Sequence, residues 1–189
     1  MHRLKPYLVG HQEFAALYRV EPAMVGQWLS PSRNALDPAT AIVVSGVRYW
    51  PLAFAARYGT TTPRFKQVDV EVKQRLIAEQ GEGWEADLGD ELPAIVGQQE
   101  IIQLFHLPSQ GNLATSLATG RFPDPDWELS GSPLWLLDTV LEAVPELRAS
   151  ARTLPWQVDE AVVAALRGGT YDGPGSKVLT RGRHARKSL

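Results

Sequence analysis

Four polar side chains lie close together in the first quarter of the chain, in and just after a short apolar-patterned stretch: Gln27, Ser30, Arg33 and Asn34. An amide can form two hydrogen bonds with adenine, and a guanidinium can do the same with guanine. Hydroxyl and amide groups also bind phosphate oxygens. The chemistry open to these residues is therefore recognition by hydrogen bonding. The alternative is a solvated helix face.

Catalytic or metal-binding chemistry is not indicated by the residue spacing. The chain has no cysteine, which excludes disulfides and thiolate ligands, and its four histidines are scattered. Asp124 and Asp126 could suggest a carboxylate pair, but they alternate with Pro123 and Pro125 and are more typical of a turn. The Gly-rich stretch 170–177 lacks the residue order of a phosphate loop and a following helix. We therefore expect no enzyme, no cofactor and no metal.

A stretch near the N-terminus returns in the second half of the chain, and this repeat organises the sequence. Residues 9–18 (VGHQEFAALY) correspond to residues 96–105 (VGQQEIIQLF) at an offset of 87 positions. The offset falls to 85 where Ser45-Gly46 matches Ser130-Gly131 and Trp50 matches Trp135. A match at nearly fixed spacing indicates a duplicated structural unit.

The apolar spacing predicts the elements of the first copy. Residues 12–19 and 22–29 each place apolar side chains at i, i+3 and i+4, and Pro22 suits the first turn of the second helix. Two short helices joined by a tight turn form a helix-turn-helix. Residues 41–50 then predict a β-hairpin with a Ser-Gly turn, and residues 52–58 a third helix. Trp28 and Trp50 are expected in the core rather than stacked on a ligand.

The second copy follows the same plan. Ile101, Leu104 and Phe105 line its first helix, and Ser109 is suited to cap the second. A short hairpin is expected over 127–135, and a third helix from Leu137.

In this order the residues resemble the winged helices of the MerR, AlpA and excisionase group. The second copy carries the resemblance through Phe122-Pro123-Asp124-Pro125 and 130–135, whereas the first has Ala35-Leu36-Asp37-Pro38 and a longer hairpin. The resemblance covers about half the chain, once per copy. It implies a mainly α fold with short β-hairpins, built from two tandem winged helix-turn-helix units joined by a helical connector. Members of the group bind DNA.

The resemblance assigns candidate DNA contacts, because the second helix of a helix-turn-helix enters the major groove. In the first copy they are Gln27, Ser30, Arg33 and Asn34, with Arg48 near the hairpin tip for a phosphate or a minor groove. A strand-edge salt bridge is the alternative for Arg48. In the second copy the candidates are Gln110, Thr115 and Arg121, on a face that could equally bind a protein. Lys177, Arg181 and Arg183 belong to a basic tail suited to phosphates.

The net charge of −2 is unevenly distributed. Residues 1–60 carry +3 and residues 148–189 carry +5, whereas residues 61–92 carry −4 and residues 93–147 carry −6, with Arg121 as the only basic residue. DNA affinity depends largely on phosphate neutralisation. The first copy and the tail therefore suit a duplex, and the second copy suits it poorly.

Two segments lie outside the copies. Phe65, Val68, Val72 and Leu76 form a helical stripe that ends before Gly81, although 68–72 also alternates as a strand does, and 82–91 is expected to be an acidic loop. A last helix is expected over 155–167, capped by Thr153, and it could dock on the second copy or mediate dimerisation. The expected boundaries are 1–62, 63–91, 92–148 and 149–189.

The resemblance implies a sequence-specific protein that binds double-stranded DNA, and we expect it in the cytoplasm at the nucleoid. A transcriptional regulator, an excisionase-like factor of a mobile element and a partition or maintenance factor all fit. Direct, asymmetric and palindromic half-sites remain open. The alternative is an adaptor whose acidic second unit recruits a protein, or self-associates. No apolar run is long enough for a membrane span.

Overall fold

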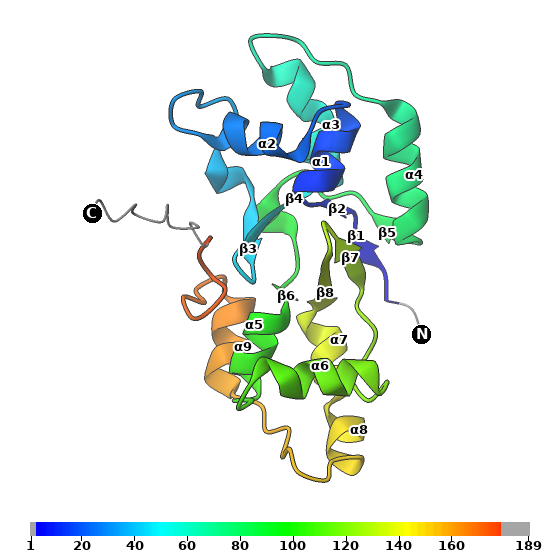
Figure 1. The fold of residues 1–189 in the computed structure, drawn as a ribbon, viewed down its shortest axis with the longest axis vertical. Coiled ribbons are helices and arrows are strands. Elements are labelled where there is room, and N and C mark those ends of the chain that lie inside the picture. Colours follow the sequence, from blue (N-terminus) through cyan, green and yellow to red (C-terminus); the bar gives the residue numbers. More distant parts are fainter. Residues whose placement is uncertain (1–2, 179–189) are drawn as a thin grey trace, which may run out of the picture.

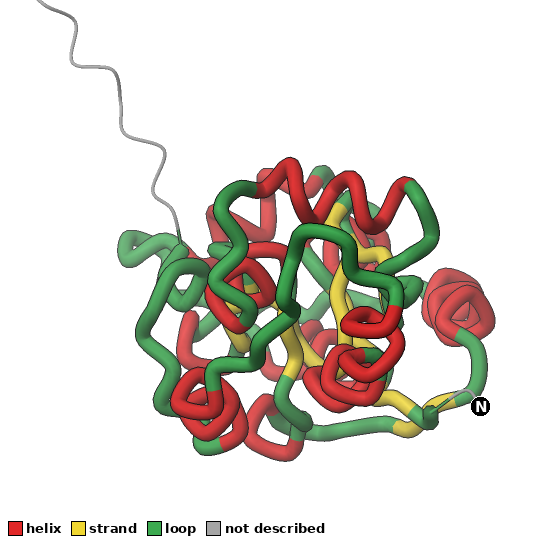
Figure 2. The backbone as a smooth tube through the Cα atoms, turned by 90° about the horizontal axis from the view of Figure 1, so that it is seen from below, coloured by secondary structure: helices red, strands yellow, loops and turns green. Residues whose placement is uncertain are grey.

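The computed structural model describes residues 3–178 and has a mixed α/β architecture of helices and small sheets. In Figure 1 the first copy occupies one end of the long axis and the second copy the other, with strands between them. Seen along that axis, most strands lie inside a surround of helices (Figure 2). Within the described residues, no helix is both long and apolar enough to cross a membrane.

The first copy contains the elements expected from its periodicity. Strand β2 (Leu8–Val9) precedes helices α1 (His11–Leu17) and α2 (Pro22–Leu29). A short 3-10 turn (Pro38–Thr40) leads into the hairpin β3 (Ile42–Val44) and β4 (Val47–Pro51), and α3 (Leu52–Thr61) follows directly. Strand β4 pairs with both neighbours, which gives the antiparallel order β2-β4-β3.

The second copy repeats this order. It comprises β6 (Ile95–Val96), α5 (Gln98–Leu104), α6 (Gln110–Ala118), the hairpin β7 (Trp127–Leu129) and β8 (Ser132–Leu136), and α7 (Leu137–Glu142). Its sheet has the equivalent order β6-β8-β7. A further helix, α8 (Val144–Ala149), follows α7.

Backbone conformations repeat as well as elements. Ser45 and Gly46 have φ angles of 48° and 78°, and Ser130 and Gly131 have 49° and 77°. Positive φ at both central residues is the geometry of a tight hairpin turn whose twist matches that of the strands. Arg19 and His106, which follow the C-cap residue of the first helix of each copy, have φ angles of 52° and 49°. The repeat in the sequence is therefore a repeat of the fold.

Each copy has its own core. In the first, Phe14 packs edge-on against Trp28, Trp50 and Tyr58, with ring centroids 5.2–6.0 Å apart. Trp28 and Trp50 are 3% and 0% exposed, so the assignment of both to the core is confirmed. In the second copy Phe122 packs edge-on against Trp135, at 5.6 Å. Edge-on packing suits aromatic rings because the positive edge of one meets the negative face of another.

A third core lies between the copies, and we call it the junction. Strand alternation creates it, since successive residues of a strand face opposite sides. Tyr49 therefore faces the junction while Trp50 faces its own copy, and Leu134 and Trp135 divide in the same way. The junction core consists of Leu8, Val44, Tyr49, Ile95, Trp127, Leu129, Leu134 and Leu136.

The connector forms helix α4 (Val70–Gln80), and the helical interpretation of this stretch is confirmed. The expected apolar stripe started at Phe65, which lies before the helix and is 71% exposed. The helix itself starts after Asp69, which caps it. Leu76 reaches the first core. Beyond α4, β5 (Gly83–Trp84) pairs in parallel with β1 (Lys5–Pro6), and a 3-10 turn forms over Gly89–Glu91. The segment expected to be an acidic loop thus contains a strand that the sequence did not indicate.

The last helix, α9 (Glu160–Arg167), is shorter than expected. Asp159 caps it through Ala161 N–H and Val162 N–H, so the assignment of the cap to Thr153 was wrong. The helix docks on the second copy, where Val163 and Trp156 enter the core and Asp159 N–H donates to Leu104 O at 2.9 Å. Residues 168–177, which we call the strap, return to the junction, where Gly46 N–H donates to Gly175 O at 2.8 Å.

Candidate nucleic-acid interface

Helix α2 has one buried face and one open face. Val25 and Trp28 are buried, whereas Ala23, Gly26 and Gln27 are exposed. A Cβ placed on Gly26 would meet no atom within 4 Å, so this part of the helix is bare backbone. Ala23 and Gly26 are small, so a flat or grooved partner can approach the helix closely at the Gln27 amide. Glu21 precedes the helix as its N-cap residue and is exposed. Its carboxylate opposes phosphate at that end.

The loop after α2 holds the other predicted contacts. Ser30 Oγ donates to Gln27 O at 2.7 Å, so its proton is used within the protein and the hydroxyl can only accept from a ligand. Arg33 is exposed, with its guanidinium 3.9 Å from Met24 Sδ. Asn34 is exposed and has φ 43°. Gln27 thus lies in the last turn of α2, and Arg33 and Asn34 lie in the loop that follows, where their N–H groups donate to Ser30 O.

Lys66 borders the same region, and sequence reasoning missed it. Its Nζ lies 5.6 Å from the Trp28 ring and 6.0 Å from the Tyr58 ring, within the range of a cation–π contact. Arg64 is exposed close by, and its backbone oxygen accepts from Lys66 Nζ at 3.2 Å. Both residues follow α3 and belong to the connector in sequence. Only the fold shows that the charge of Lys66 is next to α2.

Helix α6 has an equivalent open face of different chemistry. Leu113 and Ser116 are buried, and Ser116 Oγ donates to Asn112 O at 3.0 Å. Gln110, Gly111, Ala114 and Thr115 are exposed. Ser109 is the N-cap residue of α6, as predicted, and its N–H donates to Asn112 Oδ1 at 3.1 Å. Thr115 occupies the position of Gln27, because Leu113 matches Val25 in the core.

The structure brings cations beside α6 that the charge count assigned to another segment, residues 148–189. Arg121 and Arg152 line the same small cavity of about 40 Å³, with Ser116 and Trp156 in its wall. Arg148 Nε donates to Trp156 O at 3.1 Å. The expectation that Arg121 is the only cation of the second copy holds for residues 93–147, but it is wrong for the folded unit. The segment after α8 supplies the missing charge.

The hairpin tips do not project into solvent. Ser45 N–H and Ser45 Oγ donate to the two carboxylate oxygens of Glu100 at 2.7 and 2.5 Å. Gln99 N–H donates to Ser45 Oγ at 3.0 Å. The first tip is thus packed on the start of α5, which removes it from insertion into a minor groove. That part of the expectation for Arg48 is corrected.

Arg48 itself is half-buried and lies near His11. Burial and the charge of Arg48 hold the pKa of His11 below its ordinary value, with Glu13 acting in the opposite direction. The His11 ring lies 5.5 Å from that of Trp50. Within residues 3–178 Arg48 forms no salt bridge, so the strand-edge pair proposed as its alternative role is absent there. Lys177 is exposed at the end of the strap, and Arg181 and Arg183 lie outside the described residues.

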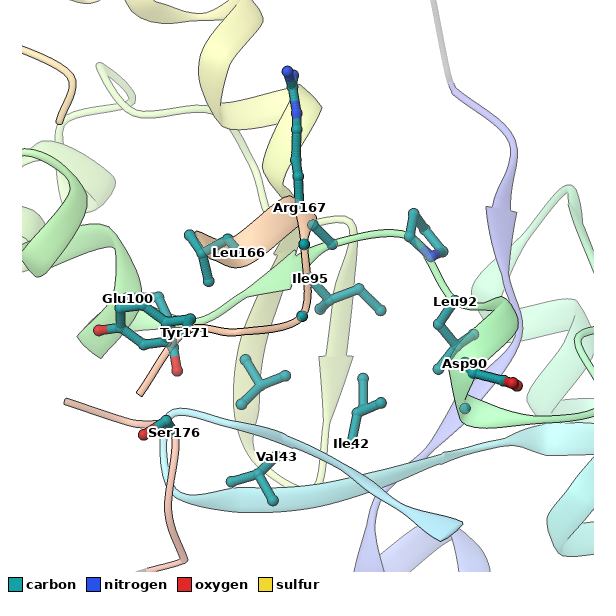
Figure 3. Close-up of a pocket in the computed structure, with 16 residues that line it drawn as sticks. Ile42, Val43, Asp90, Leu92, Ile95, Glu100, Leu166, Arg167, Tyr171 and Ser176 are labelled. Atoms are coloured by element: carbon teal, nitrogen blue, oxygen red, sulfur yellow. The ribbon is translucent and has the colours of Figure 1, made fainter. Parts of the chain in front are cut away.

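An open groove of about 570 Å³ lies between the hairpin β3-β4 and α9 (Figure 3). Tyr171 and Glu100 lie at one end of it, and Arg167 points away from its floor. Burial, followed by the charges of Glu100 and Asp172, raises the pKa of Tyr171 to about 12. Both Glu100 oxygens already accept hydrogen bonds, from Ser45 and from Gly97 N–H. The carboxylate thus serves the junction.

No family model, curated protein or solved structure matches the chain. Helices α2 and α6 and the cations beside them are therefore the features from which a function can be inferred. Within the described residues, no group of three or more His, Cys, Asp or Glu side chains is arranged to hold a metal ion.

Proposed function

We propose that this chain is a sequence-specific protein for double-stranded DNA, built from two winged helix-turn-helix units, 8–61 and 95–149. The observation that carries the proposal is the repeated pair α1–α2 and α5–α6, in which the second helix of each pair exposes small and polar residues beside cations. A helix of this kind can enter a major groove with its outward residues at the base edges.

Each open face has a defined role in this proposal. The Gln27 amide and the Arg33 guanidinium read base edges, since both can form paired hydrogen bonds with a purine. Lys66 and Arg64 contact phosphates on one side of α2, and Arg121 and Arg152 do so beside α6. Phosphate contacts fix the register of the protein on the duplex, and base contacts provide the specificity.

The experiment is selection of duplexes from a random library by the full chain at two salt concentrations, followed by fluorescence anisotropy on the enriched duplex. We expect Arg33→Ala to cost about 1–3 kcal/mol at one base position if the residue reads guanine, and to weaken all duplexes equally if it binds phosphate. Gln27→Ala is expected to relax preference for one base pair.

Arg75→Ala and Gln74→Ala are matched controls, because both residues are exposed on α4, away from α2. They remove the same functional groups and are expected to bind like the wild type. No enrichment, together with binding that disappears at the higher salt concentration, would overturn the proposal. The adaptor alternative would then be tested by proteins that co-purify through the second unit.

A further inference from the structure

The contact that the first copy makes with the second is matched by an equivalent contact that the second copy makes with the first. At one end, Ser130 N–H and Ser130 Oγ donate to the Glu13 carboxylate at 2.7 and 2.6 Å. At the other, the corresponding Ser45 groups donate to Glu100 at 2.7 and 2.5 Å. The hairpin turn of each copy therefore docks on the first helix of the other copy.

The agreement extends to the backbone around both carboxylates. Gln12 N–H donates to Ser130 Oγ at 3.1 Å, and Gln99 N–H donates to Ser45 Oγ at 3.0 Å. Each helix begins after a glycine, and a Cβ on Gly10 would overlap Ser130 Oγ just as one on Gly97 would overlap Ser45 Oγ. Eight positions in two separate contacts thus share one geometry.

Reciprocal contacts of this kind define the relation between the copies. The rotation that carries the first copy onto the second also carries the Ser45–Glu100 contact onto the Ser130–Glu13 contact. The same rotation must therefore carry the second copy onto the first. An operation that restores the start when applied twice is a two-fold rotation, and the interface is isologous. The junction core agrees, since it contains both members of the equivalent pairs Leu8 and Ile95, Val44 and Leu129, and Tyr49 and Leu134.

The two-fold axis relates α2 to α6, which lie toward opposite ends of the long axis in Figure 1. Two recognition helices related in this way meet a duplex with opposite polarity, so operator symmetry mirrors protein symmetry. The outward residues are not the same, however. Gln27 corresponds to Thr115, Gly26 to Ala114 and Ser30 to Ala118.

We infer that the DNA site of this chain is an inverted repeat of two different half-sites, one read by α2 and one by α6. The inference rests on the proposed function and specifies its substrate. Of the direct, asymmetric and palindromic arrangements that the sequence left open, the junction favours the inverted one, and the two helix faces make its halves unequal. One chain then performs the task of a symmetric dimer without requiring an identical partner.

The test uses the full chain and exploits its lack of cysteine. Single-cysteine variants Ala23→Cys and Ser32→Cys bracket α2, and Gly111→Cys and Thr119→Cys bracket α6. All four positions are exposed, and a Cβ on Gly111 meets only Ser109 Oγ at 3.4 Å, an ordinary contact. Each variant is labelled with a tethered iron chelate, and the cuts are mapped on the duplex enriched by selection. An eight-residue helix spans about 12 Å, which is enough to separate the cuts from its two ends.

The inverted arrangement predicts one of two orders of cuts along the duplex. The order is 23, 32, 119, 111 if the ends of the two helices at 32 and 119 lie nearest the axis. It is 32, 23, 111, 119 if the ends at 23 and 111 lie nearest the axis. The order 23, 32, 111, 119 would reveal a direct repeat and overturn the inference while the proposed function stands. Cuts from α2 alone would overturn it in the same way. A library without any enriched duplex would overturn the proposed function and the inference with it.

Affinity measurements give a second readout. Reversing the orientation of one half-site within the selected duplex is expected to weaken binding about 100-fold. The helix that reads this half-site then loses its base contacts, and the two units no longer bind the duplex at the same time. Changing the flanking base pairs is the matched control. The double variant Gln27→Thr, Thr115→Gln is expected to exchange the base preference between the two half-sites at one position. Equal affinity for both orientations would overturn the inference.

Discussion

The Glu13 carboxylate accepts hydrogen bonds from the backbone N–H and the hydroxyl of Ser130, at 2.7 and 2.6 Å, although the two residues lie 117 positions apart. The same carboxylate also accepts from Gly10 N–H at 3.0 Å, which closes the first turn of α1. One side chain thus caps a helix and holds the hairpin of the other copy. Because Glu100 does the same for Ser45, the tips that a free wing would present to DNA are committed to the junction.

Removal of the Glu100 carboxylate is expected to destabilise the whole chain. Glu100 is only 2% exposed, and Glu100→Ala would leave Ser45 N–H, Ser45 Oγ and Gly97 N–H without their acceptor. Hydrogen bonds to a charged group contribute about 1.5–3 kcal/mol, and buried donors left unpaired add to the cost. We expect the free energy of unfolding to fall by roughly 3 kcal/mol, measured by urea denaturation.

Glu13→Ala is the matched variant at the other end of the junction. Glu13 has the equivalent partners, Ser130 and Gly10, but is only half-buried, so water can replace the lost acceptor and the expected cost is smaller. Glu128→Ala removes an exposed carboxylate from β7 and is expected to change little. If Glu100→Ala were no more costly than Glu128→Ala, the carboxylate would not stabilise the junction.

Local structure could be predicted from the sequence because local signals determine it. The inward residues of α2, the Ser-Gly turns and the end of α4 at Gly81 depend on spacing and turn chemistry within a few residues. The cap of α9 was misassigned because Asp159 and Thr153 are both residue types that cap helices well. The helix begins directly after Asp159. Lys66 and Arg152 were missed because only packing brings them beside α2 and α6.

The serine–carboxylate contacts of the junction were the main feature that sequence reasoning missed, although a signal for them exists. Glu13 and Glu100 occupy the same position of the repeat, as do Ser45 and Ser130. A polar residue repeated on an otherwise variable helix face indicates a shared contact, but it does not identify the partner. Periodicity places Glu13 on a surface, and only the tertiary arrangement shows that the other copy covers it.

The position of His11 predicts a loss of stability in mild acid. Burial and Arg48 lower the pKa of folded His11 below 6.5, so the unfolded chain binds the proton more readily. Well above pH 6.5 both states are neutral at this residue and it contributes no pH dependence. As the pH falls below 6.5 the unfolded state gains a proton first, and the free energy of unfolding decreases until the folded pKa is reached.

His11→Gln removes this titration and keeps a polar side chain at the position. The measurement is the urea midpoint of wild type and variant at pH 8 and pH 5.5, and the expected result is a smaller decrease for the variant. Using the difference between the two proteins cancels the titration of the remaining groups. An identical decrease for both would show that His11 titrates normally in the fold.

The cations beside α6 predict a change in salt dependence. If Arg121 and Arg152 both contact phosphates, the double variant Arg121→Ala, Arg152→Ala should reduce the slope of log affinity against log salt by about 2, roughly 1 for each lost contact. Anisotropy titrations on the selected duplex at several salt concentrations measure the slope. Arg75→Ala on α4 should leave it unchanged. An unaltered slope in the double variant would place α6 off the duplex.

Gly175 is expected to be irreplaceable in the strap. Its φ is +90°, and a Cβ there would overlap Glu100 Oε1 and approach Ser45 Cα at 3.0 Å. Gly175→Ala therefore combines an unfavourable backbone conformation with a clash at the contact that fastens the first hairpin. Gly169→Ala is the control, because Gly169 also has a positive φ, +68°, but open space around it. The control should cost about 1–2 kcal/mol, the usual penalty for a left-handed residue. Gly175→Ala should cost more and should also speed proteolysis of residues 168–177. Equal costs for the two variants would mean that the strap moves aside without disturbing Glu100.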